Sequence, residues 1–266
     1  MSPMYNDEKI MKTLDRSYMS EYLLQAQWAE FIKLKEVITE LLKTQDAPLS
    51  VLDIGVGDGR IPLHLSGLEE LWGMIGSYDG IENSNPCIEQ ARKNVREKDL
   101  ESKVHLFQLD ARDLETAELL RFRTYDLVLC TYFTAGNFAV DDFSFEPDES
   151  GTLHFLPHLD SNLVFEKVFL SAYGLLRPQG EIVLGSVYID NPATRKKQEQ
   201  FYRNCGMEVI TPPDCSFTAT REGFWSQRFT EDKIDDYFHW VNPHNVHFLP
   251  LDTYQFAAMV RVVKEG

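Results

Sequence analysis

Cysteine is scarce in this 266-residue chain. No two of its four copies have the Cys-x-x-Cys spacing; they stand as Cys87, Cys130, Cys205 and Cys215. A disulfide framework or a zinc site needs cysteines at short, regular spacings. We therefore expect buried or free thiols, and no metal site.

Long apolar runs are missing as well, whereas a transmembrane helix needs about 20 consecutive apolar residues. The first residues, Met1 to Asp7, lack the apolar stretch of a secretory signal peptide. The sequence thus predicts a soluble, cytoplasmic protein without a membrane partner. With 43% hydrophobic residues, a chain of this length can bury one full core.

Basic residues are outnumbered, because 26 Lys and Arg face 42 Asp and Glu and leave a net charge of −16. Nucleic-acid affinity comes largely from Lys and Arg on phosphates, so we expect no nucleic-acid partner. From Thr124 to Glu166 there is no Lys or Arg, and the connection 138–160 mixes acids with phenylalanines. Such a segment suits a lid over an amine or cationic substrate, and equally a solvated acidic loop with aromatic anchors.

The stretch from Val51 to Arg60 reads Val-Leu-Asp-Ile-Gly-Val-Gly-Asp-Gly-Arg. An apolar run that breaks at glycines and leads into a helix is typical of ligand binding at a strand end in an α/β sheet. Glycines let a ligand approach the backbone, and the helix start offers free N–H groups. The third glycine comes too early for a dinucleotide fingerprint, and the Gly-Lys-Ser/Thr of a P-loop is absent. An ordinary glycine-rich turn is the alternative.

This stretch resembles the first motif of class I S-adenosylmethionine-dependent methyltransferases, which reads hydrophobic-Leu-Asp-hydrophobic-Gly-x-Gly-x-Gly. The resemblance implies S-adenosylmethionine as the cofactor. It implies that the loop residues Gly55, Val56 and Gly57 lie against the amino-acid end of that cofactor. It also implies that Asp53 helps to hold the loop and the cofactor ammonium group.

Acids follow the next two predicted strands in the order that the family has. Glu82 ends the second strand, with Asn83 beside it, and matches the acid that binds both ribose hydroxyls. Asp79 is the rival, three residues earlier, and a surface acid at a strand end is the other alternative. After the third strand, Asp110 matches the acid against the adenine amino group, and Ala111 supplies backbone N–H to the ring.

The fourth predicted strand, 125–133, resembles the family's aromatic-Asp-hydrophobic-hydrophobic motif. Its far end should face the sulfonium and the substrate, because open α/β sheets bind ligands outside the carboxyl ends of their strands. Cys130 and Thr131 are therefore expected at the cofactor. The Asn-Pro-Pro-Tyr signature of amino-methylating nucleic-acid enzymes is missing. Candidates for a catalytic base are Tyr132, His154 and His158, and the sequence favours none of the three.

Residues 1–48 carry apolar side chains at helical spacing, which predicts a helical segment packed on the sheet or covering the pocket. Residues 49–266 then form a methyltransferase-like α/β domain. The element order predicts a doubly wound, mostly parallel sheet. The resemblance implies seven strands with an antiparallel last strand, built by a hairpin of 245–249 and 255–263.

Residues 191–228 depart from the family pattern and are expected to form an insert beside the substrate pocket. A helix is predicted in its first part, and two short extended pieces follow around 207–210 and 217–220. The polar side chains at its end either orient a substrate carboxylate or support the fold; they are Arg221, Trp225, Gln227 and Arg228.

Function is less constrained than fold, because one fold hosts many chemistries. The expected reaction is transfer of the cofactor's methyl group to nitrogen or oxygen of a small molecule, with an amine or cationic acceptor as one option. The alternatives are a methyltransferase acting on a protein or nucleic acid, an aminopropyltransferase-like enzyme, and a non-catalytic S-adenosylmethionine-binding protein. The oligomeric state is not predicted.

Overall fold

The computed structural model describes residues 7–45, 48–120, 122–138, 162–211, 215–251 and 255–266. The strands are β1 (Leu49–Ile54), β2 (Ile75–Glu82), β3 (Val104–Gln108), β4 (Tyr125–Cys130), β5 (Leu176–Ile189), β6 (Phe217–Ala219), β7 (Trp225–Phe229), β8 (Val246–Pro250) and β9 (Ala257–Val263). The α-helices are α1 (Glu8–Met11), α2 (Glu21–Thr44), α3 (Arg60–Ser66), α4 (Glu69–Gly73), α5 (Asn85–Glu97), α6 (Leu163–Gly174), α7 (Pro192–Asn204) and α8 (Glu231–Tyr237). Short 3₁₀ turns lie between them, and among the described residues no helix is long and apolar enough to cross a membrane.

Strands β1 to β5 are parallel to one another and lie in the order β3-β2-β1-β4-β5. Strand β9 pairs antiparallel with β5, and β8 pairs antiparallel with β9. The predicted doubly wound, mostly parallel sheet with an antiparallel last strand is confirmed. The described sheet has nine strands, two more than the expected seven, because the insert adds the hairpin β6–β7.

The extra hairpin joins the sheet through an unusually long β5. The last residues of this strand, Tyr188 and Ile189, run past the point where β4 ends and pair in parallel with Arg228 and Phe229 of β7. The Trp225–Phe229 strand was not predicted. All five of its side chains are buried in the folded protein, and they mix polar and aromatic residues. The sequence therefore lacks the alternation of apolar and polar residues that marks a half-buried strand.

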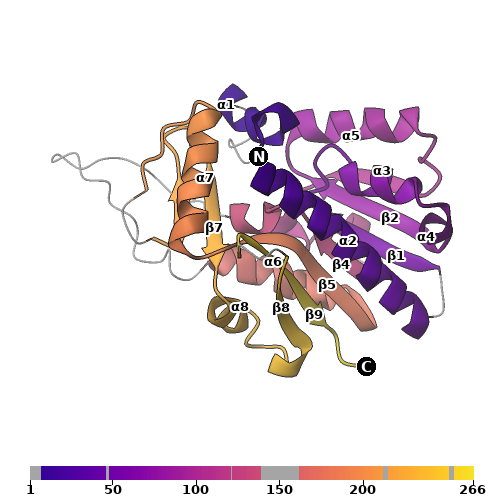
Figure 1. Cartoon of the computed structure of the whole chain (residues 1–266). Helices are drawn as coiled ribbons and strands as arrows, with labels where there is room; N and C mark the ends of the chain where they lie inside the picture. Colours follow the sequence, from indigo (N-terminus) through magenta and orange to yellow (C-terminus); the bar gives the residue numbers. More distant parts are fainter. Residues whose placement is uncertain (1–6, 46–47, 121, 139–161, 212–214, 252–254) are drawn as a thin grey trace.

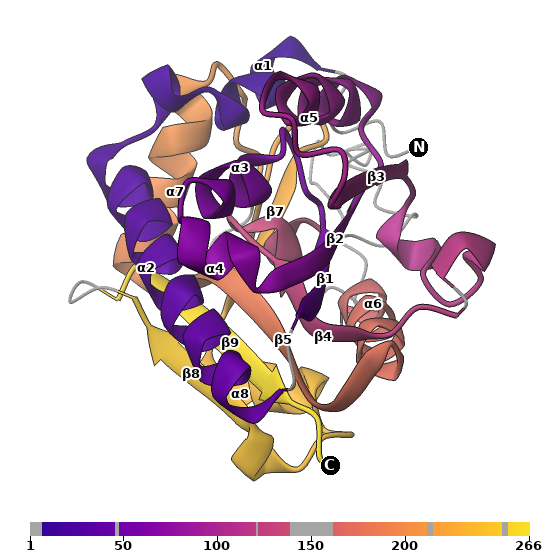
Figure 2. The ribbon, with the colours of Figure 1, turned by 90° about the vertical axis from the view of Figure 1, so that its right-hand side faces the viewer.

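Helices cover both faces of the sheet (Figures 1 and 2). Val51 and Leu127 point to the face covered by α2, α3 and α5, whereas their neighbours Leu52 and Val128 point to the face covered by α6 and α8. Successive side chains of a strand alternate between faces, and here both faces are apolar. This pattern is typical of a parallel sheet buried on both sides.

A third apolar cluster lies at one end of the sheet, where α1 and the start of α2 meet α7 and the hairpin β6–β7. It contains Ile10 from the N-terminal segment, Phe201 and Tyr202 from α7, and Phe133 from the turn after β4. The predicted N-terminal segment and the predicted insert therefore pack on each other, although about 180 residues separate them in the chain.

Arg228 holds the insert together. Its guanidinium is fully buried and donates to the Asp190 carboxylate, to the side-chain oxygens of Gln198 and Thr218, and to the carbonyls of Cys215 and Phe217. These bonds occupy the whole guanidinium, so the structure supports the interpretation of Arg228 as a residue that supports the fold.

Replacement of Arg228 by Met should lower the free energy of unfolding by about 3 kcal/mol or more, because it leaves buried oxygens without a donor. Urea unfolding monitored by circular dichroism measures this loss. The matched control is Arg221→Met, since Arg221 forms an exposed ion pair with Glu208 and should cost about 1 kcal/mol or less. Equal losses in the two variants would contradict the structural role of Arg228.

Candidate functional site

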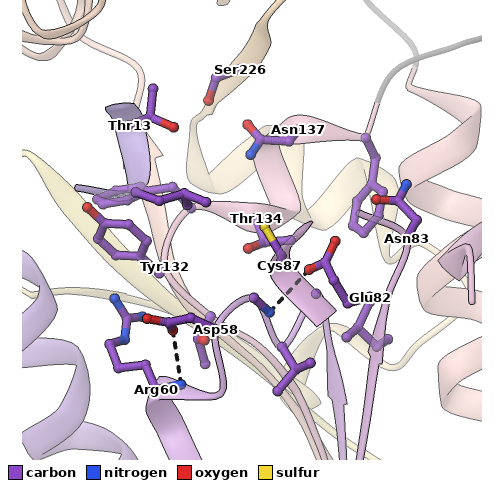
Figure 3. Close-up of a pocket in the computed structure, with 18 of the residues that line it drawn as sticks. Thr13, Asp58, Arg60, Glu82, Asn83, Cys87, Tyr132, Thr134, Asn137 and Ser226 are labelled. Carbon is purple, nitrogen blue, oxygen red and sulfur yellow. Dashed lines mark hydrogen bonds between the residues drawn. The ribbon is translucent and has the colours of Figure 1, made fainter. Parts of the chain in front are cut away.

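A cavity of about 570 Å³ opens at the carboxyl ends of β1, β2 and β4. One side, which we call the loop side, is lined by the glycine loop and the ends of β2 and β3 (Figure 3). The other side, which we call the aromatic side, is lined by the N-terminal segment, the turn after β4, α7 and the insert hairpin. Its aromatic residues are Tyr132, Phe133, Tyr188, Phe201, Tyr202, Phe224 and Trp225.

The glycine loop adopts a backbone conformation that only glycines adopt without strain. Gly55, Gly57 and Gly59 have φ values of 73°, 59° and 83°. A Cβ atom on Gly55 would lie 2.5 Å from the methyl group of Thr134, whereas a Cβ on Gly57 would meet nothing within 4 Å. Gly55 thus permits close packing against the turn after β4. Gly57 leaves its backbone open to the cavity.

Glu82 lies at the end of β2 and lines the cavity. One oxygen of its carboxylate accepts the N–H of Gly57 at 3.1 Å, and the other accepts the N–H of Ser84 at 2.8 Å. Burial raises the pKa of Glu82, and these N–H groups act in the opposite direction. The carboxylate therefore ties the glycine loop to the end of β2 while it lines the cavity.

Asp79, the rival acid, lies elsewhere. It is buried within the sheet, where its carboxylate accepts the Tyr125 hydroxyl at 2.7 Å, forms an ion pair with Arg123 and lies 3.1 Å from the ring of His105. It does not line the cavity. Asp79 therefore anchors this edge of the sheet, and Glu82 is the acid available to a ligand.

The end of β3 contributes Asp110 and Ala111 to the cavity, next to Asn83, whose side chain hydrogen-bonds to Asp110. Arg112 binds Asp110 through its backbone N–H and its guanidinium, at 2.7 Å for the shortest contact. Burial alone would raise the pKa of Asp110, but the bonds and charge of Arg112 hold it below its ordinary value. Asp110 therefore presents an ionised carboxylate at the loop side.

The predicted residues at the end of β4 are divided between core and cavity. Thr131 and Tyr132 line the cavity, whereas the Cys130 side chain is fully buried in the core, where burial raises the pKa of its thiol. Burial also raises the pKa of Tyr132 well above its ordinary value, and its hydroxyl donates to the sulfur of Met19. Burial therefore disfavours the phenolate form that Tyr132 would need to act as a base. His154 and His158 lie outside the described residues.

Beneath the cavity lie two carboxylates that no solvent reaches. Asp53, at the end of β1, accepts the Tyr78 hydroxyl through one oxygen, and its other oxygen has no hydrogen-bond partner among the described residues. Glu30, from the middle of α2, lies 3.6 Å from the Arg60 guanidinium. Glu30 is not among the residues predicted from the sequence. Its signal was the position itself, because Glu30 interrupts the buried apolar stripe of α2.

Comparison with known proteins identifies the family of this chain. A family model described as a methyltransferase domain matches residues 45–239. The chain belongs to the methyltransferase family. Its predicted class, S-adenosylmethionine-dependent methyltransferase, and its predicted cofactor are confirmed. No curated protein matches this methyltransferase in sequence.

Three solved structures illustrate what the methyltransferase resembles. An S-adenosylmethionine-dependent methyltransferase from Clostridium acetobutylicum is 13% identical, with 97% of both chains covered and a TM-score of 0.54. The CcbJ methyltransferase from Streptomyces caelestis is 13% identical, with 90% of both chains covered and a TM-score of 0.54. An amino pentose methyltransferase from Micromonospora echinaspora, with S-adenosylmethionine bound, is 14% identical, with 88% of this chain and 91% of that chain covered and a TM-score of 0.52. At these identities the likeness shows a shared fold.

The residues of the methyltransferase fit the cofactor chemically. Gly57 leaves space beside its backbone, and Glu82 and Asp110 offer carboxylate oxygens to hydroxyl and amino groups. A nucleoside with an amino-acid tail carries the donors that these acceptors need.

Stability should depend on pH through Asp53. Burial raises the pKa of Asp53 to about 7, whereas an unfolded Asp loses its proton near pH 4. The folded state therefore holds more protons in this window, so stability falls as pH rises from about 4 to about 7. Between pH 5 and pH 7.5, the free energy of unfolding of the Asp53→Asn variant should fall by about 2 kcal/mol less than that of the unsubstituted protein. Urea unfolding at both pH values measures the difference.

The exposed Asp235 provides the matched control, since it lies on the outer side of α8. Asp235→Asn should retain the pH dependence of the unsubstituted protein. If Asp53→Asn retains it too, the assigned titration of Asp53 is wrong.

Proposed function

We propose that this methyltransferase transfers a methyl group to nitrogen or oxygen of a small molecule bound on the aromatic side of the cavity. The observation that carries the proposal is the continuity of this cavity, in which the cofactor-compatible loop side and the aromatic side form one space. A volume of about 570 Å³ lies within the range of small-molecule sites, which is ~300 to ~1,000 Å³.

Most of the predicted cofactor residues would then contact the cofactor along the loop side. Asp110, Ala111 and Asn83 would hold the adenine end, and Glu82 would accept both ribose hydroxyls. The glycine loop would lie along the remaining part, toward Arg60. Cys130 and Asp53, which do not line the cavity, would act from beneath as packing and electrostatic support.

When bound, S-adenosylmethionine supplies a methyl group already activated by its sulfonium. The task of the chain is then to orient the acceptor and exclude water, so proximity provides much of the rate. The aromatic side suits this task. Phe133 stacks on Tyr188 with ring centroids 3.9 Å apart, which makes a flat, rigid wall.

The aromatic side also favours an amine or cationic acceptor, because aromatic faces attract cations. The amino pentose methyltransferase of similar fold acts on an amine-bearing small molecule by its description, which agrees with this substrate class. A protein or nucleic-acid acceptor would need a larger opening and, for nucleic acid, a basic surface that the net charge of −16 does not provide.

The reaction is tested with S-adenosylmethionine labelled on its methyl group. The protein is incubated with separate pools of small amines, small hydroxyl compounds, peptides and transfer RNA, and labelled product is identified by mass spectrometry. We expect label in the amine or hydroxyl pool. Label in peptide or RNA alone would overturn the small-molecule proposal, and tight cofactor binding without transfer to any pool would favour a non-catalytic binding protein.

The Glu82→Ala variant tests the ribose assignment. Loss of hydrogen bonds to a charged acceptor costs ~1.5–3 kcal/mol, so affinity for S-adenosylhomocysteine should fall about 10- to 100-fold by calorimetry. The control is Glu89→Ala, because Glu89 lies exposed on the following helix and pairs with Arg92. An unchanged affinity in folded Glu82→Ala protein would exclude Glu82 from the ribose.

A further inference from the structure

Glu30 joins the N-terminal helix to the cavity although it does not line it. It lies in the middle of α2, and its side chain is 1% exposed. One carboxylate oxygen accepts the backbone N–H of Tyr132 at 2.9 Å and the hydroxyl of Ser186. The other oxygen faces Arg60 at 3.6 Å. A carboxylate this deeply buried is costly, so these partners must offset its loss of water.

The sheet is shaped around this carboxylate. A Cβ atom on Gly185 would lie 2.9 Å from the carboxyl carbon of Glu30, so β5 has room for the side chain only because residue 185 is glycine. The next residue, Ser186, donates its hydroxyl to Glu30, and its backbone carbonyl accepts the N–H of Phe133 at 3.0 Å. Two neighbouring residues of β5 thus accommodate Glu30: the first leaves room for its side chain, and the second binds its carboxylate.

The turn that Glu30 holds is strained. Tyr132 and Phe133 have φ values of 52° and 60°, and two successive non-glycine residues in the left-handed region are unfavourable. Glu30 binds the N–H of the first, and Ser186 binds the N–H of the second. The same turn places Thr134 against Gly55 of the glycine loop. A contact from α2 therefore determines where the wall of the cavity lies.

Arg60 completes the arrangement on the side of the cavity opposite Glu82 and Asn83 (Figure 3). Its guanidinium lies over the Tyr132 ring, 4.3 Å from the centroid, and its charge faces Glu30. Arg60 is the first residue of α3 and lines the cavity. It therefore presents a fixed cation next to the glycine loop.

We propose that Glu30 is a positioning residue, which holds Arg60 and the Tyr132–Phe133 turn so that they bind the amino-acid end of the cofactor. The guanidinium of Arg60 would donate hydrogen bonds to the carboxylate of that end, and the Tyr132 ring would keep the guanidinium in place. This inference rests on the proposed placement of adenine and ribose at Asp110 and Glu82. It makes the N-terminal helix part of the cofactor site.

The test compares two ligands by calorimetry. S-adenosylhomocysteine has the amino-acid end, whereas 5′-methylthioadenosine keeps adenine, ribose and sulfur and lacks it. In Glu30→Gln the amide can still accept an N–H, but its NH₂ group repels Arg60. We expect affinity for S-adenosylhomocysteine to fall at least tenfold while affinity for 5′-methylthioadenosine stays within twofold. Arg60→Met should give the same pattern.

Two further variants separate positioning from folding. Ser186→Ala removes only the hydroxyl that binds Glu30 and should shift the ligand ratio in the same direction by a smaller factor. Glu36→Gln is the control, because Glu36 is exposed on α2 and pairs with Lys33, and it should change neither affinity. If Glu30→Gln does not fold, Arg60→Met and Ser186→Ala decide the question.

Each outcome has one meaning. The positioning role would be overturned if folded Glu30→Gln or Arg60→Met lost affinity for both ligands equally, or kept its affinity for both. If the unsubstituted protein bound neither ligand, the cofactor placement itself would fail. If it bound both ligands and only the variants failed to discriminate, the placement would stand and the inference about Glu30 would fall.

Discussion

Burial of the parallel strands on both faces is the constraint on which the rest of this methyltransferase depends. Strands β1 and β4 have apolar side chains on either side, so helices must cover the whole sheet and leave open only the ends of its strands. The polar backbone groups of the loops that leave β1, β2 and β4 cannot be buried without partners. They meet at one edge, and a cavity forms there. The glycine loop and Glu82 lie at that edge for this reason.

The second feature of the molecule is a pair of ionisable carboxyl groups buried under the cavity. Glu30 and Asp53 are both fully buried, and burial raises the pKa of both. Both carboxyl groups share Arg60 as a cationic neighbour, and its charge acts against that rise. An arrangement of this kind costs stability, and proteins keep it chiefly where function requires it. Its position directly below the glycine loop agrees with a role in binding a zwitterionic group.

The aromatic side of the cavity is built from segments far apart in the chain. The N-terminal segment, the turn after β4, α7 and the β6–β7 hairpin each contribute one part. None of these segments can form a wall alone, because the side chains of each are buried against the others. In the proposed placement, the core sheet would supply the site for the cofactor, and the additions to it would supply the space for an acceptor.

The sequence by itself determined which residues line the loop side of the cavity. The glycine spacing, Glu82 and Asp110 depend on local chain order, because each follows directly from the end of one strand. Only the tertiary structure showed that Glu82 lines the cavity and Asp79 does not, since it pairs Asp79 with Arg123 and Tyr125 from a distant segment. Only the tertiary structure revealed the β7 strand, the structural role of Arg228 and the contact of Glu30 with Tyr132. These depend on pairings between residues tens to more than a hundred positions apart, and no local pattern in a sequence encodes which distant residues will meet.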